Sequence, residues 1–466
     1  MAGPGFVQLA QLTGTSNSIP SLQVAVYPGP FDLHTDEVLR QNAEKELVPQ
    51  IVKALTGKIE ATAEVQEKRN SEKTVFSGTL EEINRYFSDV GWSDGAAIVP
   101  PTPERVAAFL KYTDYAPDEE IAILASANLR ATPRIIAANG VMAGARPEHM
   151  PLLIAMVQAI GDPRYKVSYS RRAGSTHSFQ TYYWLNGPLA RQLGVDFGQG
   201  LIAFPINHVI GRTMSLIERN IAGYTIKLTQ VGTFGKVTSW VLAEDEESAL
   251  RIGWKPNNVE RGFDLNANTV TTGESTVWGQ NLIPSTSDPK ILMQLIAYDL
   301  THKEQFAAGW NGSKRTLLIT PTTAQVLAEG GYTKESLKKE LAATARVVTY
   351  EWAWSKVHGS YGAIYPPFEE ELATTMAEAR AEKGKLPPWY PRFPGWEDIK
   401  TTPVVSGPSD LEILVLGDPS RNKVQALSAN GYNTIQIRLP KNWDELMKAA
   451  GYRPLSEFLL SAPKGK

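Results

Sequence analysis

The chain contains no cysteine among its 466 residues. This absence excludes disulfide bridges, thiolate metal ligands, cysteine nucleophiles and dithiol redox chemistry. Any reaction must therefore use His, Asp, Glu, Lys, Arg, Ser, Thr or Tyr side chains, or a cofactor whose identity the composition leaves open.

A long apolar run and an excess of one charge are also missing. No stretch approaches the roughly 18 apolar residues of a membrane helix, and the N-terminus has no basic region followed by an apolar segment. The 47 basic and 49 acidic residues nearly cancel, so no strong field attracts nucleic acid or anionic lipid. We expect a cytoplasmic protein with a small-molecule substrate and no nucleic-acid or membrane partner; a homo-oligomer is left open.

The length and the pattern of apolar residues predict the fold class. A chain of 466 residues with 42% hydrophobic composition can bury a large core, with about two or three domains as the usual expectation. Short apolar runs alternate with helical patterns, which predicts a mixed multi-layer α/β fold. We expect an N-terminal βα region (1–75), a large central domain (76–311) and a C-terminal α/β region (312–466) with two similar βα units.

Capping residues and periodicity predict the individual elements. The first expected unit is a strand over Leu22–Tyr27 followed by a helix over Thr35–Leu55. Further helices are expected at Leu80–Tyr86, after Thr102-Pro103, after Thr132-Pro133, and at Met150–Ile160, Leu189–Leu193 and Asn207–Ile221. Strands are expected at Thr181–Leu185 and Lys236–Ala243, and we interpret the acidic run 244–247 after the second of them as a solvated turn.

Two similar patterns occupy the last third of the chain. The expected strand 317–320 leads to a helix that ends at Gly330-Gly331, and the expected strand 413–416 leads to one that ends at Asn430-Gly431. A glycine after a helix is typical of a left-handed C-cap. Both units continue into another helix, and two parallel strands with crossover helices are the simplest arrangement.

Several motifs give the chain a family resemblance. These are Trp92-Ser93-Asp94-Gly95, Val141-Met142-Ala143-Gly144-Ala145-Arg146-Pro147-Glu148, Asn186-Gly187-Pro188, Ile210-Gly211-Arg212 and Glu260-Arg261-Gly262-Phe263. With them the chain resembles the large domain of the UGSC-motif (seleno)proteins over roughly residues 76–272, which implies a shared fold and site region. That family pairs a selenocysteine or cysteine with Gly-Ser-Cys, and often has a cysteine at the position of Ala145. This chain has neither, so the redox role that the family name implies is not carried over.

The segment 170–178 holds the richest group of polar side chains. Its candidate binding and catalytic residues are Arg171, Arg172, Ser175, Thr176 and His177. Arginine forks bind carboxylate or phosphate, a Gly-Ser-Thr turn adds backbone donors, and an imidazole can act as a general base. One hypothesis is an anion clamp with a catalytic His177, and the alternative is a polar turn with a structural histidine. Gln180 and Tyr182 follow as candidate substrate contacts, with core packing as the alternative for Tyr182.

A second candidate is the segment Arg146-Pro147-Glu148-His149. The proline stops one helix and begins the next, so Glu148 and His149 fall in a first turn, where a free helix N-terminus attracts anions. In the functional hypothesis Arg146 binds substrate while Glu148 and His149 are catalytic. The alternative is helix capping with a buried pair of Arg146 and Glu148.

The third candidate is a pair of substrate contacts, His208 and Arg212, which are four residues apart and share one face of a helix. Packing against a neighbouring strand is the alternative. His149, His177 and His208 could also combine with Glu148 as metal ligands, but the close spacings of strong metal motifs are missing. Metal and cofactor therefore stay open.

These observations favour an enzyme that acts on a small anionic or polar organic molecule by acid–base chemistry, of the lyase, hydrolase or isomerase type. The alternatives are a metal- or flavin-assisted oxidoreductase, and a non-catalytic binding or assembly subunit that has lost its redox residue.

Overall fold

The computed structural model describes residues 2–17, 19–29, 34–57, 74–125, 127–165, 179–225, 229, 232–233, 235, 238–275, 278–304, 314–348, 401–429 and 431–461. The chain is an α/β protein, as the sequence predicts. Its main helices are α1 (Val7–Ser16), α2 (Asp36–Asn42), α3 (Val48–Thr56), α4 (Leu80–Asp89), α5 (Pro103–Leu110), α6 (Pro133–Ala143), α7 (Met150–Gly161), α9 (Pro188–Leu193), α10 (Pro205–Asn220), α11 (Glu246–Arg251), α12 (Asn257–Glu260), α13 (Pro289–Glu304), α14 (Pro321–Glu329), α15 (Lys334–Thr344) and α18 (Trp443–Ala449). Its strands are β1 (Ala122–Leu124), β2 (Leu129–Ala131), β3 (Gln180–Asn186), β4 (Trp240–Ala243), β5 (Thr269–Ser275), β6 (Lys314–Ile319), β7 (Arg346–Val348), β8 (Thr401–Pro403), β9 (Leu411–Val415), β10 (Val424–Ala429) and β11 (Asn433–Gln436).

The larger sheet has the strand order β11-β5-β3-β4, and β3 is buried along its whole length. Successive side chains of a strand point to opposite faces. Tyr182 and Trp184 therefore pack on the second sheet, whereas Tyr183 and Leu185 join the large core formed with α6, α7 and α10. Both faces of β3 are therefore buried, each against a different layer.

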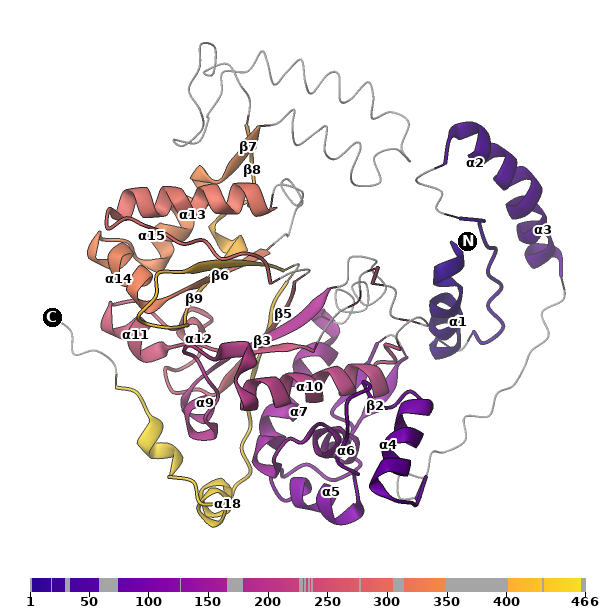
Figure 1. Ribbon diagram of the computed structural model, residues 1–466, viewed down its shortest axis with the longest axis horizontal. Coiled ribbons are helices and arrows are strands. Elements are labelled where there is room, and N and C mark those ends of the chain that lie inside the picture. Colours follow the sequence, from indigo (N-terminus) through magenta and orange to yellow (C-terminus); the bar gives the residue numbers. More distant parts are fainter. Residues whose placement is uncertain are drawn as a thin grey trace, which may run out of the picture.

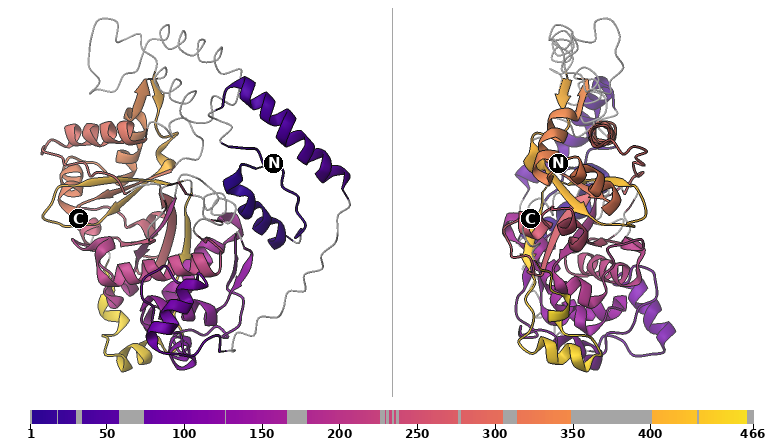
Figure 2. Two further views of the ribbon diagram at one scale, coloured as in Figure 1. Left: turned by 45° about the vertical axis from the view of Figure 1, so that its right-hand side comes forward. Right: turned by 90° about the vertical axis from the view of Figure 1, so that its left-hand side faces the viewer.

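The second sheet has the order β10-β6-β9, and it too packs one face on the other sheet and one face on helices. Leu318 of β6 faces the first sheet, while Leu317 and Ile319 face a separate core built with α13, α14 and α15. The layers therefore follow the order helix, sheet, sheet, helix (Figures 1 and 2). The small helical unit α1–α3 lies at the periphery, away from both sheets (Figure 1).

The C-terminal segment returns to the central domain. β10 pairs with β6 in the second sheet, and β11, which follows after three intervening residues, pairs antiparallel with β5 in the first. The chain then reaches α18, where Trp443 is buried in the large core and its Nε1 donates to Gln192 Oε1 over 2.9 Å. Residues after 432 therefore complete the sheet and the helix layer of the preceding region.

Most of the predicted elements are confirmed, and two are wrong. Leu22–Tyr27 contributes only an isolated bridge between Ala2 and Val26, although Thr35 caps the helix that follows. The helix expected to end at Asn430-Gly431 is instead the strand β10. This segment pairs with the edge of β6 and is buried along most of its length, so tertiary pairing overrides the helical pattern. The expected parallel pair in this region is present as β6 and β9. No helix in the described part of the chain has the length and apolar character needed to cross a membrane.

A buried network of ion pairs joins the two sheets and the helix α15. Lys334 Nζ lies 2.9 Å from Glu244 Oε1 and 3.3 Å from Glu260 Oε2, with only 4% of the lysine side chain exposed. Lys338 contacts the other oxygen of Glu260 at 3.0 Å. Burial alone would lower the pKa of Lys334, but Glu244 and Glu260 hold it above its ordinary value. The ammonium is therefore charged inside the protein.

The network corrects the interpretation of the acidic run 244–247. Glu244 and Glu246 are buried, so a solvated turn is wrong for both. Glu244 also accepts from Asn186 Nδ2 at 2.7 Å, and Glu246 pairs with Arg191 at 2.6 Å. A carboxylate is tolerated in a core when its oxygens are hydrogen-bonded and paired, and these partners come from distant parts of the chain.

We expect Lys334→Met to lower the free energy of unfolding by about 3–5 kcal/mol, because it leaves Glu244 buried without its cation. Lys339→Met, an exposed position of the same helix, is the control and should change stability by less than about 0.5 kcal/mol. Urea denaturation of both variants measures the difference. Adding Glu244→Gln to Lys334→Met should recover part of the lost stability. Equal stability of Lys334→Met and Lys339→Met would contradict this role of the network.

Candidate functional site

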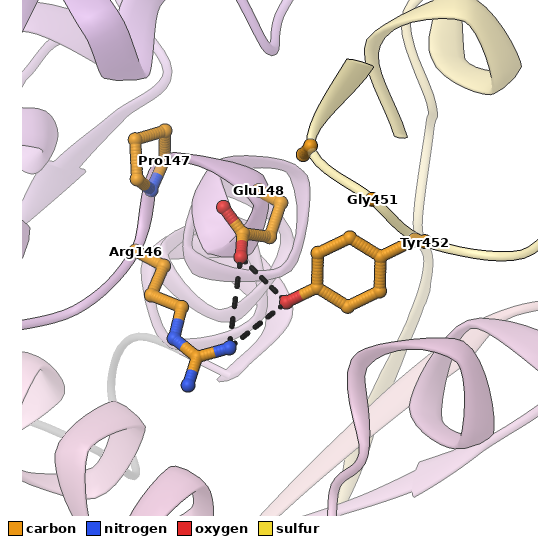
Figure 3. A pocket seen from close by; sticks show the side chains of 6 residues that line it. Arg146, Pro147, Glu148, Gly451 and Tyr452 are labelled. Atoms are coloured by element: carbon orange, nitrogen blue, oxygen red, sulfur yellow. Dashed lines mark hydrogen bonds and ion pairs between the residues drawn. The ribbon is translucent and has the colours of Figure 1, made fainter. Parts of the chain in front are cut away.

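A hollow of about 450 Å³ opens where two distant segments meet, residues 146–148 and 450–452. α6 ends at Ala143 and is capped by Gly144, whose φ of 83° is in the left-handed region. Pro147 begins the short turn that leads into α7. The other wall follows α18, where Gly451 has a φ of 84°. Figure 3 shows Arg146 and Glu148 on one side of the hollow and Tyr452 on the other.

Three polar side chains interact in this hollow. The Tyr452 hydroxyl donates to Glu148 Oε1 over 2.6 Å, and Arg146 Nη1 donates to the same hydroxyl over 3.0 Å. The guanidinium and the carboxylate are 4.0 Å apart at their nearest, too far for a direct hydrogen bond. Only 7% of the Glu148 side chain is exposed, against 59% for Arg146. A largely buried anion and an open cation are therefore joined through one phenol.

The surroundings keep the phenol protonated. Burial raises the pKa of Tyr452, and its hydrogen bond to Glu148 raises it further, while Arg146 acts in the opposite direction. At neutral pH the tyrosine is therefore a neutral phenol, which donates a hydrogen bond to the Glu148 carboxylate. A phenol and a carboxylate are both side chains that can serve in general acid–base chemistry.

His149, the next residue after Glu148, is not part of the wall of the hollow. Its Nδ1 accepts the backbone N–H of Arg146 over 3.2 Å, and only 1% of the residue is exposed. Burial, followed by the charge of Arg146, lowers the pKa of His149 to about 3. Its neutral imidazole holds the backbone at Arg146, and within the described residues its Nε2 has no hydrogen-bond partner.

The remaining predicted contacts are distributed over the fold. Arg212 of α10 makes two bonds to Asp94, at 2.8 and 2.9 Å, and also donates to backbone carbonyls. Burial alone would raise the pKa of Asp94, but Arg212 holds it below its usual value. A substrate carboxylate would have to displace this pair. His208 is exposed on the same helix, and neither residue lines the hollow of Arg146.

Gln180 and Tyr182 are both buried in β3. The Gln180 Nε2 is 3.5 Å from Ser239 Oγ. Tyr182 packs between the sheets, with its hydroxyl 2.9 Å from Thr316 Oγ1, which is the environment of a core residue. The predicted anion clamp lies outside the described residues, together with its members Arg171, Arg172, Ser175, Thr176 and His177. In the parts of the chain that are described, no three or more His, Asp or Glu side chains are placed to hold a metal ion.

Sequence reasoning found Arg146 and Glu148 but missed Tyr452, which is 304 residues from Glu148. No motif marks this tyrosine, and only the return of the C-terminal segment brings it to the hollow. Comparisons with family models, curated proteins and solved structures found no match to this chain. The function proposed below therefore depends on the geometry of the hollow and on the resemblance described above.

The lowered pKa of His149 predicts a loss of stability in acid. The unfolded chain binds a proton at its ordinary pKa, about 6.5, whereas the folded chain binds it only near 3. Stability is therefore complete above about pH 6.5 and falls as the pH is lowered toward 3, by up to about 1.4 kcal/mol per pH unit. Urea denaturation from pH 8 to about pH 4 measures this dependence.

His149→Asn keeps an acceptor for the Arg146 backbone but cannot titrate. The slope of stability between about pH 6.5 and pH 5 should therefore be shallower in this variant than in the wild type. His302→Asn is the control, because His302 is exposed on α13. Identical pH profiles for the wild type and His149→Asn would show that the buried imidazole is not responsible.

Proposed function

We propose that this chain is a cytoplasmic enzyme that performs acid–base chemistry on a small anionic organic molecule in the hollow of Arg146, Glu148 and Tyr452. The observation that carries the proposal is the hydrogen bond of 2.6 Å between the Tyr452 hydroxyl and the Glu148 carboxylate, with the open guanidinium of Arg146 beside it. Together they provide an anion contact, a proton donor and a proton acceptor within one cavity.

Each side chain has a distinct role in the proposed reaction. Arg146 holds a carboxylate or another anionic group through the N–H groups that do not contact Tyr452. Glu148 removes a proton from a carbon next to a carboxyl or carbonyl group, and the electron pair moves onto the carbonyl oxygen. Arg146 stabilises that oxygen by hydrogen bonds. Delivery of the Tyr452 hydroxyl proton to the other face gives isomerisation, after which protonated Glu148 returns its proton to the phenolate through their hydrogen bond. Departure of a neighbouring substituent with its electron pair gives elimination.

The resemblance to the UGSC-motif (seleno)proteins supports this location. The position at which that family often has a cysteine is Ala145 here, which directly precedes Arg146. The hollow therefore adjoins the position at which that family often has a cysteine. Because the thiol is missing, the proposed chemistry uses the carboxylate and the phenol instead.

The proposal is tested by incubating the protein in D₂O with a panel of small 2-oxo acids, 2-hydroxy acids and amino acids, and following C–H exchange and elimination by proton NMR. Glu148→Gln and Tyr452→Phe should each reduce the rate by about 10²-fold or more, the usual effect of removing a general base or acid. Tyr115→Phe is the matched control, because the Tyr115 hydroxyl accepts from Gln158 outside the hollow. Equal rates for Tyr115→Phe and Tyr452→Phe, or no reaction of any probe with folded protein, would contradict the proposal.

A further inference from the structure

Two opposite charges in the hollow keep unused hydrogen-bonding capacity. Tyr452 engages only Oε1 of Glu148, and Arg146 uses only Nη1. In Figure 3 the dashed lines reach one oxygen of Glu148 and one nitrogen of Arg146, while Oε2, Nε and Nη2 carry none. Among the described residues, no hydrogen bond satisfies these three atoms. The hollow therefore offers a negatively charged hydrogen-bond acceptor, Glu148 Oε2, and positively charged donors on Arg146 at the same time.

The two charges do not neutralise each other closely. Their nearest atoms are 4.0 Å apart, and the Tyr452 hydroxyl bridges them from one side. A ligand with a carboxylate alone would pair with Arg146 but would place its negative charge next to the carboxylate of Glu148. Only 7% of the Glu148 side chain is exposed, so water screens this repulsion poorly. A ligand with an ammonium alone would be repelled by the guanidinium. Either choice leaves one charge of the site uncompensated at a partly desolvated position, which is unfavourable.

A ligand that carries both charges satisfies both groups. We propose that the substrate is a small zwitterion of the amino-acid class, with its carboxylate on the free N–H groups of Arg146 and its ammonium on Glu148 Oε2. The volume of about 450 Å³ accommodates a molecule of this size. This inference rests on the proposed function, because it assigns a substrate class to the same hollow.

Matched probes separate the contributions of the two charges. Isothermal titration calorimetry on the full chain would compare an amino acid with its 2-hydroxy acid, which lacks the ammonium, and with its decarboxylated amine. One such set is L-alanine, L-lactate and ethylamine, and the same comparison is repeated for the other small amino acids. We expect at least one amino acid to bind about tenfold or more tightly than both of its analogues, since each added charge pair contributes on that scale.

Two variants assign the contacts. Glu148→Gln keeps an acceptor for the Tyr452 hydroxyl but removes the negative charge, so the advantage of the amino acid over the hydroxy acid should disappear while the hydroxy acid binds at least as well as before. Arg146→Gln should weaken both carboxylate probes about tenfold or more. Arg130→Gln is the matched control and should leave every affinity unchanged, because Arg130, in β2, is a similarly exposed arginine that pairs with Glu120 outside the hollow.

The outcomes distinguish this inference from the proposed function. If the hydroxy acid binds as tightly as the amino acid and Glu148→Gln strengthens both, the site takes a plain anion; the zwitterion is then excluded while the acid–base function stands. The same holds if only non-amino acids react in the NMR panel. If no probe binds and none reacts, both the function and the substrate class fail.

Discussion

The charged lysine at the beginning of α15 is the constraint on which the arrangement of the layers depends. Lys334 is buried and has to meet the buried Glu244 and the partly buried Glu260. Such a pair is stable only when every partner is in position. Glu244 follows β4, an edge strand of the first sheet, and Lys334 belongs to the helix layer on the far side of the second sheet. Their contact therefore fixes how the two sheets stack and which side of each receives its helices.

The candidate site also depends on contacts between distant parts of the chain. Tyr452 reaches Glu148 only because β11 adds to the first sheet and α18 packs on the large core through Trp443. A loosened C-terminal segment would leave Arg146 and Glu148 in place and remove the phenol from the hollow. The arginine and the carboxylate are therefore local features of one turn, whereas the position of the phenol depends on the whole fold.

Local chemistry explains which helices could be predicted. Thr132 with Pro133, and Thr35 with the acids after it, begin helices because their side chains satisfy the free N–H groups of the first turn. Those interactions need only neighbours in the chain. The strand β10 could not be predicted, because its extended conformation is stabilised by pairing with the edge of β6, more than 100 residues earlier in the chain. The prediction for Glu244 failed for the same reason. An acidic run is typical of a solvated turn, and the buried partner of Glu244, Lys334, is 90 residues further along the chain.

The sequence by itself determined the α/β class, the absence of thiol chemistry, most helix boundaries and the proximity of Arg146 to Glu148, because each follows from residue type or from a few neighbouring positions. Only the tertiary structure decided that Glu244 and Glu246 are buried, that Arg212 is engaged by Asp94, and that Tyr452 completes the hollow. Each of these depends on contacts between residues far apart in the chain. The energy of a buried charge or phenol is set by those contacts, which no local pattern encodes.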